Sequence, residues 1–291
     1  MDFPDPGDAG IRQHPVPVIN PYFLLASFAL LLLIACQQKE KQSAPAIKTA
    51  ADSLPLTRKP LRDSLQMPAP ARKKIYITFD DGPNAGTQNV LDAVVAEQVP
   101  VSFFIVAKHV YDSREQYKVW EQLKNTSGIE LCNHSYSHAG NRYSRFYQEP
   151  RRVISDFIRS RDSLQFSNKV VRMPGRNAWR IGDNRHTDVR ASKEAIDSVA
   201  AAGFSVMGWD VEWGFDHQTF VPDADTSLMY RRIENLFRDS ATRAPGHLVL
   251  LAHDQAFRTE ADILLLRAVL SGLKRNPEYE LVLASSYPGV R

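Results

Sequence analysis

Three short segments, far apart in the chain, together carry the side chains that a metal-dependent hydrolase needs. They are residues 78–83 (Thr-Phe-Asp-Asp-Gly-Pro), 133–138 (Asn-His-Ser-Tyr-Ser-His) and 251–254 (Leu-Ala-His-Asp). Two adjacent aspartates offer one carboxylate as a metal ligand and a second as a base, and two histidines four residues apart can turn both rings toward one ion. The histidine of the third segment can supply an acid. These residue types indicate hydrolysis by a water molecule that a metal ion activates.

The two aspartates stand where a strand is expected to end. Asp80 and Asp81 follow the apolar run 75–79 and precede Gly82 and Pro83, a pair typical of turns. Because adjacent side chains at a strand end point in different directions, one carboxylate can bind a cation while the other stays free beside the water. An Asp-Gly turn with a capping aspartate is the alternative for this segment taken alone.

The two histidines lie one helical turn apart. His134 and His138 can converge on one ion if their segment is turned or helical. Solvated or core histidines would explain the same spacing. The metal site is favoured when all three segments fall at strand ends of the same predicted barrel, because one carboxylate and two imidazoles leave coordination positions open for water and substrate.

Short apolar runs rich in β-branched or aromatic residues alternate with amphipathic segments along the chain. We expect strands at residues 75–79, 101–106, 129–132, 170–173, 204–209, 248–252 and 281–284. Amphipathic patterns predict helices behind Pro150 at 153–164, around 233–237 and at 263–270. The alternation predicts a parallel α/β sheet, and about seven such units favour a barrel over an open sheet. The three segments would then meet at the carboxyl ends of the strands, where such barrels place their chemistry.

In this order and at these separations, the three segments resemble the motifs of the polysaccharide deacetylases of carbohydrate esterase family 4, also called the NodB homology domain. The resemblance covers about residues 73–288, and the first two motifs are highly specific in combination. It implies a distorted (β/α) barrel of about seven or eight strands. It also implies removal of N-acetyl groups from an N-acetylated polysaccharide, such as a glycan that contains N-acetylglucosamine.

The same resemblance implies a role for each motif residue. Asp81, His134 and His138 match metal ligands, usually for zinc, with cobalt or another divalent ion as alternatives. Asp80 matches the catalytic base and His253 the general acid. The base would take a proton as the metal-activated water attacks the acetyl carbonyl, and the acid would protonate the departing amine.

A further segment, residues 172–175 (Arg-Met-Pro-Gly), resembles part of the family pattern Arg-x-Pro-aromatic-Gly. By this resemblance Arg172 holds the base carboxylate, and Leu251 forms a wall of the acetyl pocket. A backbone N–H of Gly175 or a neighbour would stabilise the oxyanion. Because Gly175 follows the proline directly, an aromatic wall of the groove is missing unless Trp179 replaces it.

The fourth motif of the family, Asp-x-x-Asp-Trp, corresponds only to residues 209–213 (Trp-Asp-Val-Glu-Trp). Either Asp210 or Glu212 could pair with Arg172, and Trp213 could contact the substrate. Burial of both tryptophans of this segment in the core is the alternative, because each can bury a large apolar area.

Three other functions fit part of the pattern. An O-acetyl glycan esterase would use the same groups with a poorer acid. A catalytically silent sugar-binding lipoprotein would have no reason to assemble Asp80, Arg172 and His253. A non-haem iron oxygenase shares the ligand set, but its double-stranded β-barrel conflicts with the alternating helices. The glycan itself, whether peptidoglycan, an exopolysaccharide or chitin-like material, is left open.

The composition is that of one globular domain with appendages: 291 residues, of which 43% are hydrophobic and 24% charged. The net charge of +3 gives no reason to expect a nucleic-acid partner, and we expect a monomer.

Cys132 is expected to be a small core residue rather than a ligand. One charged stretch is either a basic lip that favours an anionic polymer or a solvated loop; its members are Arg176, Arg180, Arg185 and His186.

The first 35 residues have the pattern of a secretory signal. Residues 23–35 are an apolar run interrupted only by Ser27, which is short for a membrane-spanning helix. The run leads into residues 33–36 (Leu-Ile-Ala-Cys), which resemble the lipobox of bacterial lipoproteins, whose cysteine becomes the lipidated first residue. A buried helix that contains a cysteine is the alternative. The acidic stretch before the run departs from the usual positive start of such signals, so the true start site is left open.

We therefore predict a lipoprotein signal peptide at residues 1–35, a flexible Pro-rich tether at 36–72 and a catalytic domain at 73–291. A lipid on Cys36 would anchor the protein to a membrane of the bacterial cell envelope, facing the periplasm. Gln37 stands where an aspartate is often associated with retention at the inner membrane, so the outer membrane is slightly preferred. The chain has two cysteines, and no disulfide framework is expected.

Overall fold

The computed structural model describes residues 71–290, which correspond to the predicted catalytic domain. The predicted signal peptide, Cys36 and all but the last two residues of the predicted tether lie outside the described residues, so these remain predictions. Among residues 71–290, no helix combines the length and the apolar character needed to cross a membrane.

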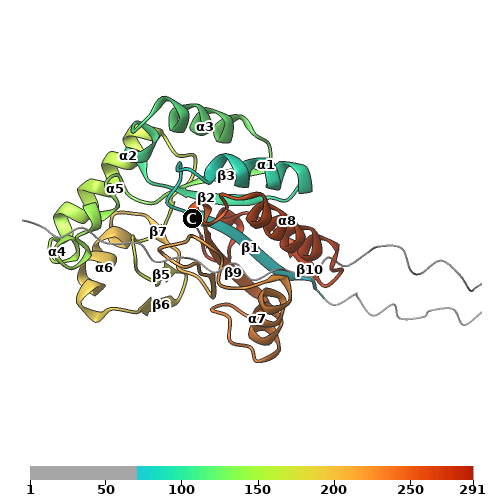
Figure 1. Cartoon of the computed structure of the whole chain (residues 1–291). Coiled ribbons are helices and arrows are strands. Elements are labelled where there is room, and N and C mark those ends of the chain that lie inside the picture. Colours follow the sequence, from blue (N-terminus) through green and yellow to red (C-terminus); the bar gives the residue numbers. More distant parts are fainter. Residues whose placement is uncertain (1–70, 291) are drawn as a thin grey trace, which may run out of the picture. The chain divides into compact units, whose positions relative to one another are not determined.

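A ten-stranded sheet runs through the described residues, with β1 (Lys73–Asp80) near its centre (Figure 1). Most of it is a row in which every neighbouring pair of strands is parallel, in the order β7 (Ser205–Val206), β4 (Val170–Val171), β3 (Ile129–Asn133), β2 (Val101–Ile105), β1, β9 (His247–His253) and β8 (Val211–Trp213). β10 (Tyr279–Leu281) pairs in parallel with the beginning of β1. An antiparallel hairpin of β5 (Ala178–Ile181) and β6 (Asn184–Thr187) continues the sheet beyond β7.

The parallel row must curl into a barrel, because the chain itself connects its two ends. β7 and β8 are the first and last strands of the row, yet only residues 207–210 separate them. Seven strands spaced about 4.8 Å apart in a flat sheet would put the end strands about 29 Å apart. The chain from Val206 to Val211 can span at most about 18 Å. Within residues 71–290 no strand pairing joins β7 to β8, so the barrel is distorted, and the predicted fold class is confirmed.

Strand β1 is buried over most of its length, as expected for a parallel strand covered on both faces. The odd-numbered residues of the run 75–79 belong to the larger core, together with residues of the surrounding helices. Tyr76 belongs instead to an interior cluster formed with residues of other strands. Because side chains alternate along a strand, Thr78 and Asp80 fall on the same inner face as Tyr76. β1 therefore carries Asp80 into the interior of the barrel at its carboxyl end.

Helices surround the sheet (Figure 1). They are α1 (Thr87–Glu97), α2 (Ala107–Val110), α3 (Arg114–Asn125), α4 (Tyr143–Tyr147), α5 (Pro150–Leu164), α6 (Lys193–Ala201), α7 (Thr226–Arg238) and α8 (Glu260–Arg275). Side chains cap three of them at the start: Ser113 at α3, Asp225 at α7 and Thr259, in a capping box, at α8. The helices predicted from amphipathic patterns are present as α5, α7 and α8.

A strand lies at or beside each predicted run, although β10 overlaps the predicted run 281–284 only at Leu281. The sheet also has additional strands at β5, β6 and β8. The β5–β6 hairpin lacks an apolar pattern and is stabilised by the buried Arg180, which donates to Oδ1 of Asp197 at 2.6 Å and to the carbonyl oxygen of His186 at 2.7 Å. Arg180 is therefore a structural residue and not part of a basic lip. β4 and β7 are shorter than predicted; Met173 and Trp209, which lie in the predicted but unpaired ends of these runs, line the cleft described below.

Candidate metal centre and active site

A cleft of about 800 Å³ opens at the carboxyl ends of the central strands. All three segments singled out in the sequence contribute to its lining through Asp80, Asp81, His134, His138, Leu251 and His253. Parallel strands bring these segments together because their carboxyl ends meet at the same end of the barrel. In the register of the neighbouring strands β1 and β9, Asp80 is paired with His253, so the two residues lie side by side.

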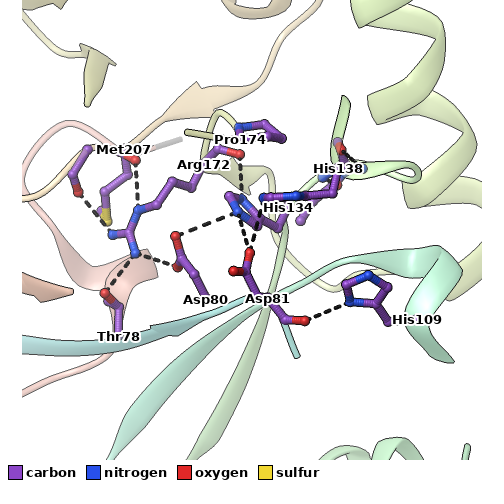
Figure 2. A network of polar contacts seen from close by, with 12 residues as sticks. Thr78, Asp80, Asp81, His109, His134, His138, Arg172, Pro174 and Met207 are labelled. Atoms are coloured by element: carbon purple, nitrogen blue, oxygen red, sulfur yellow. Dashed lines mark hydrogen bonds and ion pairs between the residues drawn. The ribbon is translucent and has the colours of Figure 1, made fainter. Parts of the chain in front are cut away.

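Asp81, His134 and His138 each bring one ligand atom to within 4.8 Å of the others (Figure 2). Oδ1 of Asp81 lies 3.3 Å from Nε2 of His134 and 3.1 Å from Nε2 of His138. Nδ1 of His134 lies 2.9 Å from the carbonyl oxygen of Arg172. Because a carbonyl oxygen can only accept, this contact places the proton of a neutral imidazole on Nδ1 and leaves the lone pair of Nε2 for a metal.

This set of atoms fits a divalent cation. Oδ1 of Asp81 is buried and has no hydrogen-bond partner among the described residues. A carboxylate oxygen that has lost its water without gaining a donor costs free energy, unless a cation binds there. One carboxylate and two imidazoles also leave positions open for water and substrate, as in catalytic metal sites. Asp81, His134 and His138 can therefore hold a metal ion.

The charges of the three residues depend on one another. Burial raises the pKa of Asp81, but attraction by His134 and His138 outweighs burial and holds this pKa well below its usual range. Burial lowers the pKa of His134, but the carboxylates of Asp80 and Asp81 outweigh this effect and raise the pKa above its usual value. Asp81 is therefore ionised, as a metal ligand would have to be, and protons would compete with a bound cation for His134.

Two of these ligands occupy strained backbone conformations. The angle φ is 76° at Asp81 and 49° at His138, in the left-handed region that side-chain-bearing residues rarely adopt. At Asp81 the backbone carbonyl oxygen lies 2.8 Å from Nδ1 of His109. Oδ2 of Asp156, on α5, accepts two backbone N–H groups of the loop between the histidines, at 3.1 and 3.0 Å. His109 and Asp156 therefore help to place the ligands, and no motif in the sequence indicated them.

Asp80 is buried beside the ligands and is paired with Arg172 (Figure 2). Its Oδ1 accepts a hydrogen bond of 2.7 Å from Nη1 of Arg172, while its Oδ2 lies 3.7 Å from Nε2 of His134. The fully buried guanidinium also donates to the hydroxyl of Thr78 and to two backbone carbonyls just after β7. It lies 4.0 Å from the centre of the Phe104 ring. Asp80 is thus held through one oxygen, and its other oxygen faces the metal ligands.

Arg172 pairs with Asp80, as the resemblance implied. The further expectation that Asp210 or Glu212 pairs with Arg172 is corrected. Both oxygens of Asp210 accept backbone N–H groups from residues at or just before β9, each at 2.7 Å. Glu212 is exposed at the rim of the cleft. Asp210, which directly precedes β8, therefore uses both oxygens in joining this segment to β9, and within residues 71–290 no ion pair joins either acid to Arg172.

His253 stands at the end of β9 and lines the cleft. Its Nδ1 is buried and, within residues 71–290, has no hydrogen-bond partner. The ring contacts Phe215 edge-on, with ring centres 5.4 Å apart. The orientation of the imidazole therefore depends on packing and on its backbone, and its place in the cleft, beside Asp80 on the neighbouring strand, suits a proton donor.

The predicted substrate contacts divide into two groups. Leu251 and Gly175 line the cleft. Trp179 and Trp213 are buried in the core instead, which corrects the prediction that they contact the substrate. A buried indole N–H needs an acceptor. Trp179 finds one in Oδ1 of Asn177 at 3.1 Å, and Trp213 finds one in a backbone carbonyl at 3.0 Å.

Tyr143, from α4, forms the aromatic wall that the sequence left unassigned. A Cβ atom on Gly175, whose φ is 60°, would lie only 3.1 Å from a carbon of the Tyr143 ring. The tyrosine ring therefore covers Gly175, the position beside which the family pattern has an aromatic residue. Trp209 and Phe215 add further aromatic lining. Trp209 belonged to a segment noted in the sequence, whereas Tyr143 and Phe215 carried no signal there.

Known proteins resemble this chain in sequence. The family model described as polysaccharide deacetylase matches residues 68–180. The Bacillus subtilis (strain 168) protein named "Putative polysaccharide deacetylase YheN" is 27% identical over 222 residues, which cover 74% of this chain and 68% of that protein. A chitooligosaccharide deacetylase of Sinorhizobium fredii is 26% identical over 208 residues, which cover 63% of this chain and 87% of that protein.

A solved structure also resembles the chain. The catalytic domain of a peptidoglycan N-acetylglucosamine deacetylase from Eubacterium rectale superimposes with a TM-score of 0.54 at 22% sequence identity, covering 76% of this chain and 94% of that domain. At this identity the likeness shows the fold alone, and it agrees with the distorted barrel described above.

Proposed function

We propose that this chain is a metal-dependent hydrolase that removes N-acetyl groups from a glycan containing N-acetylglucosamine. The matching family model and the named relatives support an enzyme of the polysaccharide deacetylase family. The observation that carries the proposal is the convergence of Asp81, His134 and His138 on one point. Asp80 and His253 flank this point as base and acid. A silent sugar-binding protein would have no use for such a pair.

Each of these groups has a place in amide hydrolysis. Asp81, His134 and His138 would hold a divalent cation, which we propose is Zn²⁺; when bound, it would lower the pKa of a water molecule and polarise the acetyl carbonyl. Asp80, oriented by Arg172, takes a proton from the attacking water through Oδ2, the oxygen that Arg172 leaves free.

Three further residues that line the cleft complete the reaction. His253 gives a proton to the departing nitrogen as the carbon–nitrogen bond breaks, so that acetate and a free amino sugar are formed. The backbone N–H of Gly175 offers a hydrogen bond to the carbonyl oxygen as negative charge develops on it. Leu251 forms an apolar wall for the acetyl methyl group.

Metal dependence and substrate can be tested together. The protein is dialysed against a chelator, Zn²⁺ or Co²⁺ is added back, and acetate release is measured with N-acetylglucosamine oligomers and with acetylated xylan. We expect release from the oligomers that is lost without metal and restored with it. Release from xylan alone would favour an O-acetyl esterase, and full activity without metal would contradict the mechanism. No release from either substrate by the metal-loaded protein would contradict the function itself.

We also propose that a lipid on Cys36 anchors the enzyme in the bacterial cell envelope, facing the periplasm, with the outer membrane slightly preferred. The apolar run 23–35 and the Leu-Ile-Ala-Cys sequence at its end support this proposal. In a bacterial host, radioactive palmitate should label the wild type and not the variant Cys36→Ser. An unlabelled wild type would remove the anchor and leave the hydrolase proposal unchanged.

A further inference from the structure

A buried polar cluster of Asn84, Thr87 and Asp254, which we call the loop clamp, joins the loop after β1 to the loop after β9. Asp254 is fully buried, and its two carboxylate oxygens accept hydrogen bonds from the side-chain amide of Asn84 and the hydroxyl of Thr87. The backbone N–H of Asn84 donates to Oγ1 of Thr87 at 2.7 Å. The loop clamp therefore connects the loop that follows the paired aspartates to the residue that follows His253.

The loop after β1 and the loop after β9 lie so close together that neither Gly82 nor Gly86 has room for a side chain. A Cβ atom on Gly86 would lie 1.9 Å from the carbonyl oxygen of Asp254, and one on Gly82 would lie 2.6 Å from its Oδ2. Burial raises the pKa of Asp254 to about 7, despite the hydrogen bonds from Thr87 and Asn84 that lower it. A buried carboxyl group is costly for stability, so its place between two catalytic loops points to a role in the site.

Other contacts already hold the base and its neighbouring ligand. Arg172 donates a hydrogen bond to Asp80, and the imidazole of His109 contacts the backbone carbonyl oxygen of Asp81. His253 has no such partner at Nδ1 within the described chain, and the next residue is Asp254 of the loop clamp. Among these three groups, His253 is therefore the one without a hydrogen bond to another side chain within the described chain, and the loop clamp follows it directly.

We propose that the loop clamp positions the general acid His253, at the end of β9, beside the base Asp80 on the neighbouring strand β1. The inference rests on the proposed deacetylase function and adds Asn84, Thr87 and Asp254 to it as positioning residues. A misplacement of about 1 Å can cost about 10²-fold in rate. An amide nitrogen must be protonated to leave, whereas the phenolate of an aryl ester leaves without an acid. A loosened clamp should therefore slow amide hydrolysis and spare aryl ester hydrolysis.

The test compares Thr87→Val, which removes the hydroxyl donor, with Thr87→Ser, which keeps it. Both full-length variants, loaded with Zn²⁺, are assayed with N-acetylglucosamine oligomers and with para-nitrophenyl acetate. We expect Thr87→Val to lower kcat for the oligomers at least about tenfold with KM within about twofold, and to lower aryl acetate hydrolysis less than about threefold. Thr87→Ser should stay within about threefold of the wild type on both substrates. Asn84→Ala, which removes the other bond to Asp254, should repeat the pattern of Thr87→Val.

Equal losses on both substrates in Thr87→Val, or equal behaviour of the valine and serine variants, would overturn the positioning role. Circular dichroism reports folding. If neither Thr87→Val nor Asn84→Ala folds, the cluster is a requirement of the fold, which also overturns the proposal. A wild type that releases no acetate from the oligomers would instead overturn the proposed function, and with it the role of His253 as an acid.

Discussion

The base side of the site, around Asp80, and the acid side, around His253, are supported differently. On the base side, the buried Arg172 makes four hydrogen bonds, one of them to Asp80. On the acid side, Nδ1 of His253 has no partner within residues 71–290, and the ring depends on its contact with Phe215 and on the clamp residue that follows it. Both groups exchange a proton in every cycle, but the base is held by a buried charged partner, whereas the acid is held by packing and by a neighbouring loop.

This contrast predicts how each side responds to mutation. Removal of one partner on the base side leaves a buried charge without compensation, which costs stability as well as activity. The acid side is held by packing and by a neighbouring loop, so its loss should be selective for substrates whose leaving group needs a proton. The ratio of amide to aryl ester hydrolysis therefore separates the two sides.

The largest effect on deacetylation is expected from substitutions of the base Asp80 and of the proposed metal ligand His134. Asp80→Asn keeps the shape of the side chain but removes the base, so deacetylation of the oligomers should fall by about 10³-fold or more while bound metal stays near the wild-type amount. His134→Ala removes a ligand nitrogen and should lose both activity and metal. Atomic absorption after dialysis measures the metal. Equal metal loss in the two variants would contradict the separate roles of Asp80 and His134.

Arg172→Met should come next and should act on stability. Methionine replaces the bulk of the side chain but leaves Asp80 buried without its partner, and breaking a buried ion pair costs about 3 kcal/mol in the free energy of unfolding. Urea unfolding followed by circular dichroism measures the loss. The matched control is Arg238→Met at the exposed pair with Asp239, which should leave the unfolding midpoint close to that of the wild type. An unchanged midpoint for Arg172→Met would show that the base side is not the rigid half of the site.

On the acid side, His253→Ala should lower deacetylation of the oligomers by about 10²-fold and leave metal content near that of the wild type. Hydrolysis of para-nitrophenyl acetate should change little, because its phenolate leaves without protonation. Asp80→Asn should lose both activities, so the two variants form a contrasting pair. If His253→Ala lost both activities equally, His253 would be acting on the water or the carbonyl and not on the leaving group.

The sequence indicated most of the site because its chemistry is local. Asp81, His134 and His138 each lie within a few positions of a strand end, and a parallel barrel brings strand ends together without further information. The left-handed backbone at Asp81 and the contact from His109 had no counterpart in the sequence pattern. They arise only when separate segments pack against one another.

Residues whose role depends on distant contacts were the ones that sequence patterns did not resolve. A tryptophan suits a sugar groove and a core equally well, and only the burial of Trp213 distinguishes the two. The β5–β6 hairpin depends on the buried Arg180, although arginine usually indicates a surface. The helices α5, α7 and α8 were visible in advance because an apolar stripe is a property of each segment alone.

The smallest effect is expected at Phe215, whose ring meets His253 edge-on. Such a contact contributes about 1 kcal/mol beyond its buried area, so Phe215→Leu should lower deacetylation of the oligomers about fivefold and leave aryl acetate hydrolysis nearly unchanged. Phe215→Tyr keeps the ring and is the matched control, expected to stay within about twofold of the wild type. If Phe215→Leu raised KM for the oligomers with kcat unchanged, the ring would be a wall for the sugar and not a support for the acid. The acid side would then depend on the loop clamp for its order.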